Sequence, residues 1–204
     1  MNKLKLTYFD FDGGRAEPAR LAMHIGGIAF EDHRFASKDF AEIRKTTPLN
    51  QVPTLLVNEV QVTQSDAITR YVGKLAGLYP TDEFQALLCD EVMSALEDVN
   101  FELGVTFGMT GDALKGAREA LVTGPFPRYL RWLQQQLEAH GGEYFADSRL
   151  TIADLKAFVM LRWFSSGVLD HIPSGLVEAE APMLKAYMDR TAALPAIAQY
   201  YATR

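Results

Sequence analysis

The chain has 204 residues, of which 48% are hydrophobic and 23% are charged, a composition ordinary for a soluble globular protein. This length allows one large domain or two small ones, and either can bury a core. The formal net charge of −6 argues against nucleic acid or an anionic membrane as a general partner.

Strand and helix signals alternate in the first part of the chain. We predict strands near residues 4–8 and 28–34, helices near 15–26 and 38–45, two strands within 53–63, and a helix over 65–77. A βαβ unit followed by a hairpin and a last helix is typical of a thioredoxin-like α/β domain with a mixed four-stranded sheet. Gly77 and Pro80 then end the helix and begin a short linker.

The strand signal disappears after the linker. Apolar residues recur with the helical period over Phe84–Val99 and Phe126–Leu137, and Leu155–Phe164 is apolar on nearly all sides, which predicts a central buried helix. Thr151 and Asp154 have the spacing of a structural capping box. We therefore predict a thioredoxin-like domain over residues 1–80 and an all-helical C-terminal domain over residues 84–204.

Residues with metal-binding or redox chemistry are few. The four histidines are scattered and fit no zinc spacing, so no metal is expected. The single cysteine, Cys89, cannot form an internal disulfide, which favours the reducing cytoplasm. We expect no apolar leader and no membrane span, because Met1-Asn2-Lys3 runs directly into the first strand and no apolar run is long enough.

Two short segments, Asn50–Leu55 and Gln64–Ile68, indicate a pocket for a small peptide. Pro53 should begin a strand, and a cis bond before it would let Val52 offer its N–H and C=O to an extended peptide. Ser65 begins a helix, and a helix N-terminus attracts a carboxylate. Three residues later stands Ile68 instead of Glu or Gln, so no capping box closes this end.

Five motifs together carry a family resemblance: Leu6–Phe9, Gly14–Glu17, Gln51–Pro53, Gln64–Ile68 and Leu150–Asp154. In this order, across nearly the whole chain, they resemble the cytosolic glutathione S-transferases, most closely the sigma-like tyrosine-type members. The resemblance implies glutathione as co-substrate, small hydrophobic electrophiles as second substrates, and a homodimer.

Tyr8 is the predicted catalytic residue. No Ser or Cys occurs between Thr7 and Arg15, and Thr7 points to the opposite face of the strand. A thiol with a pKa near ~8.5 needs a shift of roughly two units, or about 2.7 kcal/mol, to be mostly thiolate at neutral pH. One hydrogen bond to a charged acceptor contributes about 1.5–3 kcal/mol, so the phenol could supply most of the effect.

Arg15, at the start of the first predicted helix, is the second catalytic candidate. Cations are disfavoured at helix N-termini, so an arginine there indicates an anionic neighbour. That neighbour is Glu17, an acid elsewhere in the chain, or the thiolate of the ligand.

The resemblance implies the remaining site residues. Glutathione is expected to contact Tyr8, Phe40, Arg44, Gln51, Val52, Pro53, Gln64, Ser65 and, across a dimer interface, Asp98. Phe40 stands where relatives often carry Trp and cannot donate the indole hydrogen bond, whereas Arg44 keeps the charge for the glycyl carboxylate. The second-substrate pocket is expected between the domains, lined by Phe9 or Phe11, Phe101, Val105, Phe107, Trp163 and the tail near Tyr200.

Three functions remain open. The leading one is transfer of glutathione to small electrophiles. The same thiolate could instead drive a glutathione-dependent isomerisation of the prostaglandin-synthase type. The third is a non-catalytic protein that binds glutathione or hydrophobic ligands, which the presence of Tyr8, Gln51, Pro53, Gln64 and Ser65 makes less favoured.

Overall fold

A computed structural model describes residues 2–204. Its first part contains a mixed four-stranded sheet in the order β2-β1-β3-β4, with β1 parallel to β2 and antiparallel to β3. The elements of this part are β1 (Leu4–Phe9), η1 (Gly14–Ala16), α1 (Glu17–Ile25), β2 (Glu31–Phe35), η2 (Ser37–Asp39), α2 (Phe40–Ile43), η3 (Arg44–Thr46), β3 (Thr54–Val57), β4 (Val60–Thr63) and α3 (Ser65–Leu75).

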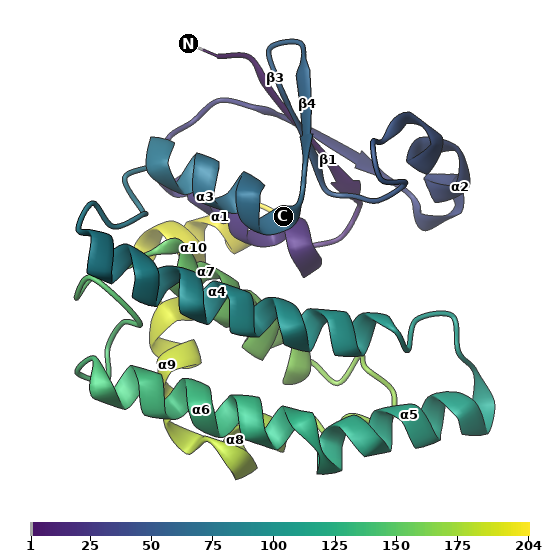
Figure 1. Cartoon of the computed structure of the whole chain (residues 1–204), viewed down its shortest axis with the longest axis vertical. Helices are drawn as coiled ribbons and strands as arrows, with labels where there is room; N and C mark the ends of the chain where they lie inside the picture. Colours follow the sequence, from purple (N-terminus) through teal and green to yellow (C-terminus); the bar gives the residue numbers. More distant parts are fainter. Residues whose placement is uncertain (1) are drawn as a thin grey trace.

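The second part is helical, so the predicted combination of a thioredoxin-like sheet domain and an all-α domain is confirmed. In Figure 1 the sheet lies at the top, α1 and α3 lie beneath it, and the helical part lies below them. The helices are α4 (Glu83–Gly104), α5 (Gly111–Thr123), α6 (Pro125–Ala139), α7 (Ile152–Phe164), α8 (Leu176–Glu180), α9 (Pro182–Ala192) and α10 (Pro195–Ala202).

The predicted central helix is α7. Residues 151–161 are all buried, and α7 contacts α1, α3, α4 and α9. Its start is fixed by the predicted capping box. The Thr151 amide donates a hydrogen bond to the Asp154 carboxylate, and the Thr151 side chain accepts one from the backbone of Asp154. Asp154 also accepts hydrogen bonds from the Phe145 amide and the Tyr187 hydroxyl, so this buried carboxylate joins three segments of the helical domain.

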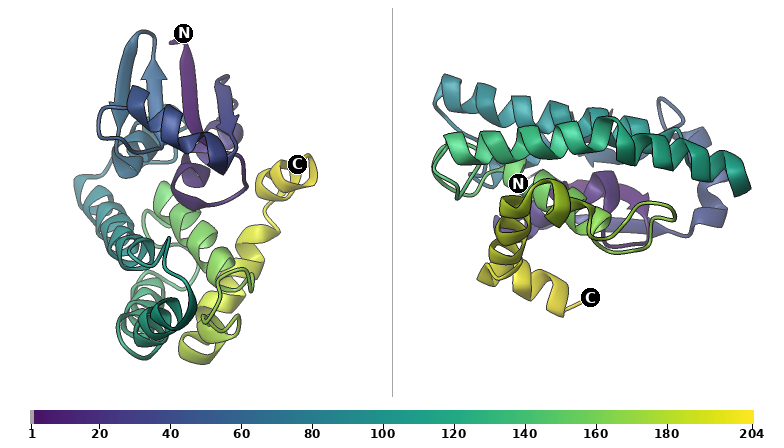
Figure 2. Two further views of the ribbon diagram at one scale, coloured as in Figure 1. Left: turned by 90° about the vertical axis from the view of Figure 1, so that its right-hand side faces the viewer. Right: turned by 90° about the horizontal axis from the view of Figure 1, so that it is seen from below.

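The C-terminal helix returns to the first domain. In both views of Figure 2 the chain end lies apart from α4–α6, and α10 packs against α1. Tyr200 of α10 is buried with its ring centroid 5.2 Å from that of His24.

Apolar periodicity alone misplaced some side chains. Leu75 is 49% exposed, whereas Gly73 of the same helix is buried. A Cβ at Gly73 would lie 2.5 Å from Cγ2 of Ile152, so α3 approaches α7 at the glycine and turns Leu75 outward. Phe84 and Leu87, at the start of α4, are also exposed, at 62% and 60%.

Candidate functional site

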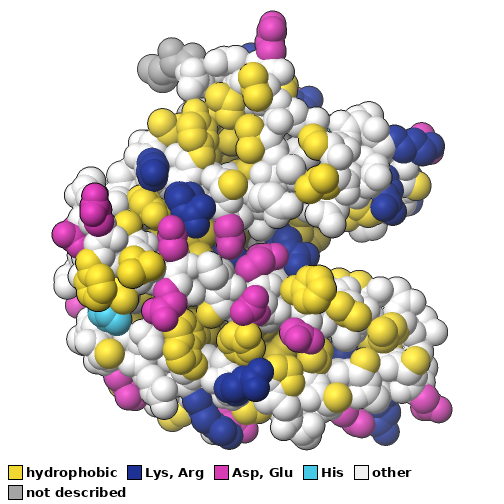
Figure 3. All heavy atoms as spheres, in the orientation of Figure 1, with side chains coloured by type: hydrophobic (Ala, Val, Ile, Leu, Met, Phe, Trp, Pro, Cys, Tyr) yellow, Lys and Arg dark blue, Asp and Glu magenta, His cyan; other side chains and the backbone are white. Residues whose placement is uncertain are grey.

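A cavity of about 920 Å³ opens between the loops of the first domain and α4, within the size range of small-molecule sites. Figure 3 shows the hollow between the two domains at the right of the molecule. Its walls come from both domains: Tyr8, Phe9, Phe11, Gly14, Arg15, Ser37, Phe40, Gln51, Val52, Pro53, Thr63, Gln64, Ser65, Glu97, Asp98, Asn100, Phe101, Phe107 and Trp163.

The Tyr8 hydroxyl is placed at the wall of this cavity by strand β1. Its oxygen accepts a hydrogen bond from the Arg15 amide at 3.2 Å, and no residue from 2 to 204 accepts its proton. Burial raises the pKa of Tyr8, despite the lowering effect of that bond and of nearby arginines, so the phenol stays protonated near neutral pH. The hydroxyl can therefore donate a hydrogen bond to a bound group.

Gly14 leaves room for this hydroxyl. A Cβ added there would lie 2.7 Å from the Tyr8 oxygen and 3.0 Å from the Phe11 ring. The residue also has a φ of +66°, in the left-handed region that favours glycine. The chain can thus turn tightly around Tyr8 and present the next amide to it.

Arg15 lies in η1, ahead of α1, and its anionic neighbour is an acid from elsewhere in the chain. Its Nε donates to Oε1 of Glu97 in α4 at 2.8 Å. Glu17 instead pairs with the buried Arg20, at 3.3 Å. The Arg15 side chain is one-third exposed and lines the cavity, as does its partner Glu97.

The Arg15–Glu97 pair continues into a partly buried chain of charged side chains that crosses the domain interface. Lys156 of α7 donates from Nζ to Oε2 of Glu97 at 3.0 Å, to Oδ1 of Asp66 at 2.5 Å, and to the Met93 carbonyl at 2.9 Å. Burial would raise the pKa of Glu97, but Lys156 and Arg15 outweigh it and lower that pKa. For Asp66, burial dominates over Lys156 and the pKa is raised.

The sequence analysis missed Lys156 and Asp66. A signal for Lys156 was present, because a lysine inside the apolar run of α7 needs a buried partner. Ser37, Thr63 and Asn100 also line the cavity and were not predicted.

The structure brings the two predicted peptide-binding segments to the same cavity. The Val52–Pro53 bond is cis, and Gln51, Val52, Pro53 and Ser65 all line the wall. The N-cap of α3 is Gln64, with φ 75°, so Ser65 is the first helical residue and not a cap. No side chain caps this helix start, and its first N–H groups remain available to an anion.

Several predicted contacts lie elsewhere. Arg44 is exposed, stacks over the Phe40 ring at 5.4 Å and does not line the cavity. Val105, the residue after α4, is 56% exposed and is also absent from the walls. Tyr200 is absent from the cavity wall and is buried where α10 packs on α1.

Aromatic side chains form the apolar end of the cavity. Phe40 lies 5.1 Å from Phe9 between ring centroids, and Phe107 stacks on Trp163 at 5.9 Å. Phe101 is 67% exposed and lines the same space. This end can accept a flat hydrophobic molecule.

Asp98 lines the same cavity as Ser65 within one chain. The sequence analysis expected Asp98 to contact glutathione across a dimer interface, whereas this position also lies at the wall of its own chain's cavity. In this structure Oδ2 of Asp98 accepts from the Tyr129 hydroxyl at 3.1 Å.

Two further kinds of feature are absent from residues 2–204. No cluster of three or more His, Cys, Asp or Glu side chains there could hold a metal ion. None of the helices described is both long and apolar enough to cross a lipid bilayer.

The sheet, the helical second domain and the cavity between them define a two-domain enzyme built on a thioredoxin-like fold. The family model for the glutathione S-transferase N-terminal domain matches residues 4–74, and the one for the C-terminal domain matches residues 97–204. The chain belongs to the cytosolic glutathione S-transferase family and is a glutathione S-transferase. This family uses glutathione as co-substrate.

Individual relatives agree with this assignment. Glutathione S-transferase 1 of Ascaris suum is 33% identical over 212 residues, covering 100% of this chain and 98% of the relative. The structure of prostaglandin synthase D of Nilaparvata lugens matches with a TM-score of 0.86 and 30% identity, over 99% of this chain and 98% of the other. A monomeric glutathione S-transferase of the hookworm Necator americanus matches with a TM-score of 0.81 and 26% identity, over 99% and 97%.

Proposed function

We propose that this enzyme activates the thiol of glutathione through Tyr8 and adds the thiolate to small hydrophobic electrophiles. The observation that carries the proposal is the protonated Tyr8 hydroxyl at the cavity wall, with its oxygen occupied by the Arg15 amide and its proton free. The phenol donates to the sulfur, and the thiol proton leaves to solvent. The thiolate then forms a carbon–sulfur bond as the leaving group departs with its electron pair.

Arg15 assists in this proposal. Its guanidinium is held by Glu97 at the cavity and adds a positive potential near the sulfur. Ser65 and Gln64 at the start of α3 would bind the α-carboxylate, and the backbone of Val52 would pair with the peptide. Phe40 offers only apolar contact, and Arg44 reaches the glycyl carboxylate only if its side chain leaves the Phe40 ring.

A glutathione-dependent isomerase is the second candidate. It is favoured by the high structural similarity to the prostaglandin synthase of Nilaparvata lugens. Turnover should be measured with a chloronitrobenzene and with a prostaglandin endoperoxide, while the bound thiol is titrated spectroscopically. Conjugation with a lowered thiol pKa supports the proposal, and turnover of the endoperoxide alone supports the isomerase. If the protein bound glutathione but turned over neither the chloronitrobenzene nor the endoperoxide, it would be a non-catalytic binding protein.

Substitution of Ser65 by Ala should weaken glutathione binding more than it weakens the fold. Ser65 is not the N-cap, so its loss removes no cap, whereas a lost donor to a largely buried carboxylate costs about 1.5–3 kcal/mol. The Michaelis constant for glutathione should rise roughly 10-fold or more, with a nearly unchanged melting temperature. A large fall in melting temperature with an unchanged Michaelis constant would show that Ser65 has only a structural role.

We further propose a homodimer in which Asp98 serves the site of the partner. Apolar side chains are exposed over β4 and the start of α4, on the face shown in Figure 3. They are Val60, Val62, Phe84 and Leu87. The hookworm relative described as monomeric shows that the fold alone does not decide the oligomeric state.

A mixed dimer tests this sharing. One subunit would carry Asp98→Asn and the other Ser65→Ala. If Asp98 acts across the interface, one site has both defects and the other has neither, so activity should be near half of wild type. Two equally impaired sites, or a monomer by light scattering, would contradict the proposal.

The domain limits and the location also remain proposals. We place the glutathione-binding domain at residues 1–80 and the helical domain at 84–204, which is consistent with the two family matches at 4–74 and 97–204. A cytoplasmic location is consistent with the free, buried Cys89, whose thiol pKa burial raises to about 11.

A further inference from the structure

The loop between β1 and η1, residues 10–13, carries one wall of the apolar end of the cavity. Phe11 of this loop lines the cavity, and its ring centroid lies 5.7 Å from that of Tyr8 and 6.3 Å from that of Phe9. Phe11 is 43% exposed, so packing alone does not fix it. Gly13 and Gly14 follow, and they leave the backbone conformationally free. The position of the Phe11 wall therefore depends on what holds this loop from behind.

Two arginines of the first domain hold the loop. Arg20, fully buried in α1, donates to the Phe11 carbonyl at 3.0 Å and to the Phe9 carbonyl at 3.3 Å. Arg34 of β2 donates from Nη2 to Oδ1 of Asp12 at 2.9 Å. Both contacts tie the loop to its own domain.

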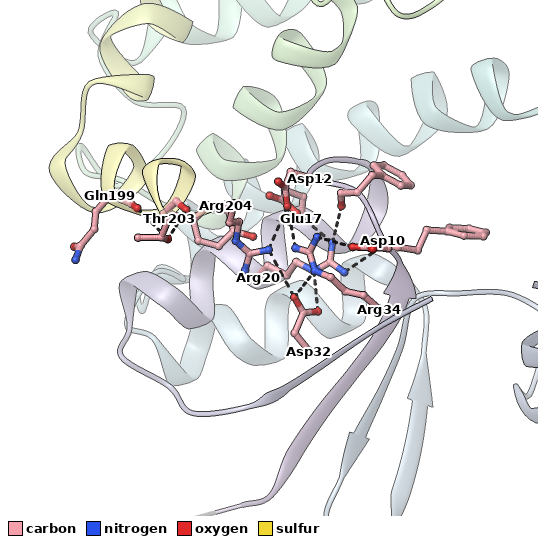
Figure 4. Close-up of polar contacts among 12 residues, drawn as sticks. Asp10, Asp12, Glu17, Arg20, Asp32, Arg34, Gln199, Thr203 and Arg204 are labelled. Atoms are coloured by element: carbon pink, nitrogen blue, oxygen red, sulfur yellow. Dashed lines mark hydrogen bonds and ion pairs between the residues drawn. The ribbon is translucent and has the colours of Figure 1, made fainter. Parts of the chain in front are cut away.

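A third arginine reaches the loop from the other domain (Figure 4). Arg204, just after α10, donates from Nη1 to the same Oδ1 of Asp12 at 3.2 Å. Its Nη1 also lies 3.7 Å from Oδ2 of Asp32, and its guanidinium lies 4.1 Å from the centroid of the Tyr200 ring. Because Tyr200 is buried against α1, the guanidinium of Arg204 is directed onto Asp12 by a fixed platform.

We propose that Arg204 is a positioning residue for the second-substrate pocket: it fixes Asp12, and through the loop it fixes the Phe11 wall. Among residues 2–204, it is the one cation of the helical part that pairs with this loop. The inference deepens the proposed transferase function and rests on it. A preformed wall lowers the ordering cost of binding a hydrophobic molecule, so Arg204 should affect the electrophile and not glutathione.

The charged side chains around this loop predict that salt weakens the contact between Asp12 and Arg204. The acids Asp10, Asp12, Glu17 and Asp32 face the bases Arg20, Arg34 and Arg204. Asp12 and Arg204 are 33% and 25% exposed, so salt should screen their attraction more than that of the buried Arg20.

The test is Arg204→Gln in the full chain. The Michaelis constant for a hydrophobic chloronitrobenzene should rise about two- to five-fold, as expected for an exposed ion pair, while that for glutathione and the pKa of the bound thiol stay unchanged. Raising the salt concentration should raise the Michaelis constant of the wild type for the chloronitrobenzene toward that of the variant. It should leave the Michaelis constant of the variant unchanged. Arg204→Lys should restore part of the effect.

The matched control is Arg131→Gln, which removes an exposed ion pair with Glu180 between α6 and α8, away from the cavity. It should leave both Michaelis constants and the salt dependence unchanged. If Arg131→Gln reproduced the effect, a general change of surface charge would explain it and the proposal would fail.

A second readout does not depend on turnover. Hydrogen exchange of the amides in residues 10–14 should become faster in Arg204→Gln, while α10 keeps its protection. Unchanged exchange in the loop would overturn the proposal, and so would a loss of protection throughout α10, which would make Arg204 a helix anchor only. If the wild type turned over no electrophile, the proposed function would fail, and the exchange result would still decide whether Arg204 holds the loop.

Discussion

Replacing Tyr8 by Phe should lower the rate of conjugation near neutral pH by about 10- to 100-fold while glutathione affinity stays nearly intact. The substitution removes one hydroxyl whose free proton faces the cavity. A hydrogen bond to a charged acceptor contributes about 1.5–3 kcal/mol, which corresponds to a rise of roughly one to two units in the pKa of the bound thiol. A spectroscopic titration of the enzyme–glutathione complex measures that pKa directly.

The change also frees the Arg15 amide, which has the Tyr8 oxygen as its acceptor at 3.2 Å. That amide can then turn to the sulfur, so some activation should remain. Tyr79→Phe is the matched control, because the Tyr79 hydroxyl donates to Asp90, away from the cavity, and its loss should leave the thiol pKa unchanged. If Tyr8→Phe kept full activity and the same thiol pKa, activation would belong to Arg15 or a backbone N–H.

Replacing Lys156 by Met should destabilise the fold by about 2–3 kcal/mol and raise the Michaelis constant for glutathione. Lys156 is 5% exposed and pairs with both Asp66 and Glu97, and Glu97 has Arg15 as its second partner. Without it, Asp66 loses its ion pair and Glu97 keeps only Arg15, and removing one partner of a buried pair costs about 3–5 kcal/mol. We expect a smaller loss than this because both carboxylates retain some contact with water. Asp66 adjoins Ser65, so glutathione binding should also weaken.

The loss of unfolding free energy in Lys156→Met should be larger at neutral pH than at acid pH. In the wild type the pKa of Glu97 is lowered, so its stabilising effect is present above its ordinary value of 4.5 and is lost as the pH falls through the folded-state pKa. In the variant, Asp66 and Glu97 lose the lowering effect of Lys156 on their pKa values, although Glu97 keeps Arg15. A buried carboxyl whose folded-state pKa is raised costs stability as the pH rises from its unfolded value, about 4, through the folded-state pKa. The difference in unfolding free energy should therefore be large at pH 7 and shrink below about pH 4.

Urea unfolding from pH 3 to 8 measures this difference. Lys185→Met is the control, because Lys185 pairs with Asp189 on an exposed stretch of α9. It should change stability by less than about 1 kcal/mol at every pH. An equal loss in the two variants, or a loss for Lys156→Met that does not depend on pH, would contradict the charge chain.

Much of this fold is predictable because its signals are local. The alternation of β1, the proline before β3 and the Thr151–Asp154 box each act within a few residues, and each was found in its place. Part of the cavity wall was predictable for the same reason, because Tyr8, Pro53 and Ser65 lie at or near the ends of strands and helices. In such a domain, the ends of neighbouring strands and the starts of the helices that follow them meet at one edge of the sheet.

The long-range pairings were not predictable from these signals. The anionic partner of Arg15 is 82 residues away, and the sequence left it open between three candidates. The exposure of Leu75 depends on Gly73 approaching α7, a contact that apolar periodicity does not report. Likewise, the direction of Arg204 depends on how α10 packs on α1, which no local pattern of residues encodes.

Gly73 has a consequence for how the two halves depend on each other. A glycine inside a helix costs about 1 kcal/mol relative to alanine, so α3 is a weaker helix by itself than its apolar pattern indicates. The side chain it lacks is the one that would collide with Ile152, at 2.5 Å. The helix that begins with Ser65 therefore gains its full order from docking on α7. The glutathione contacts proposed for Ser65 thus depend on the second domain, and the two domains should unfold as one cooperative unit.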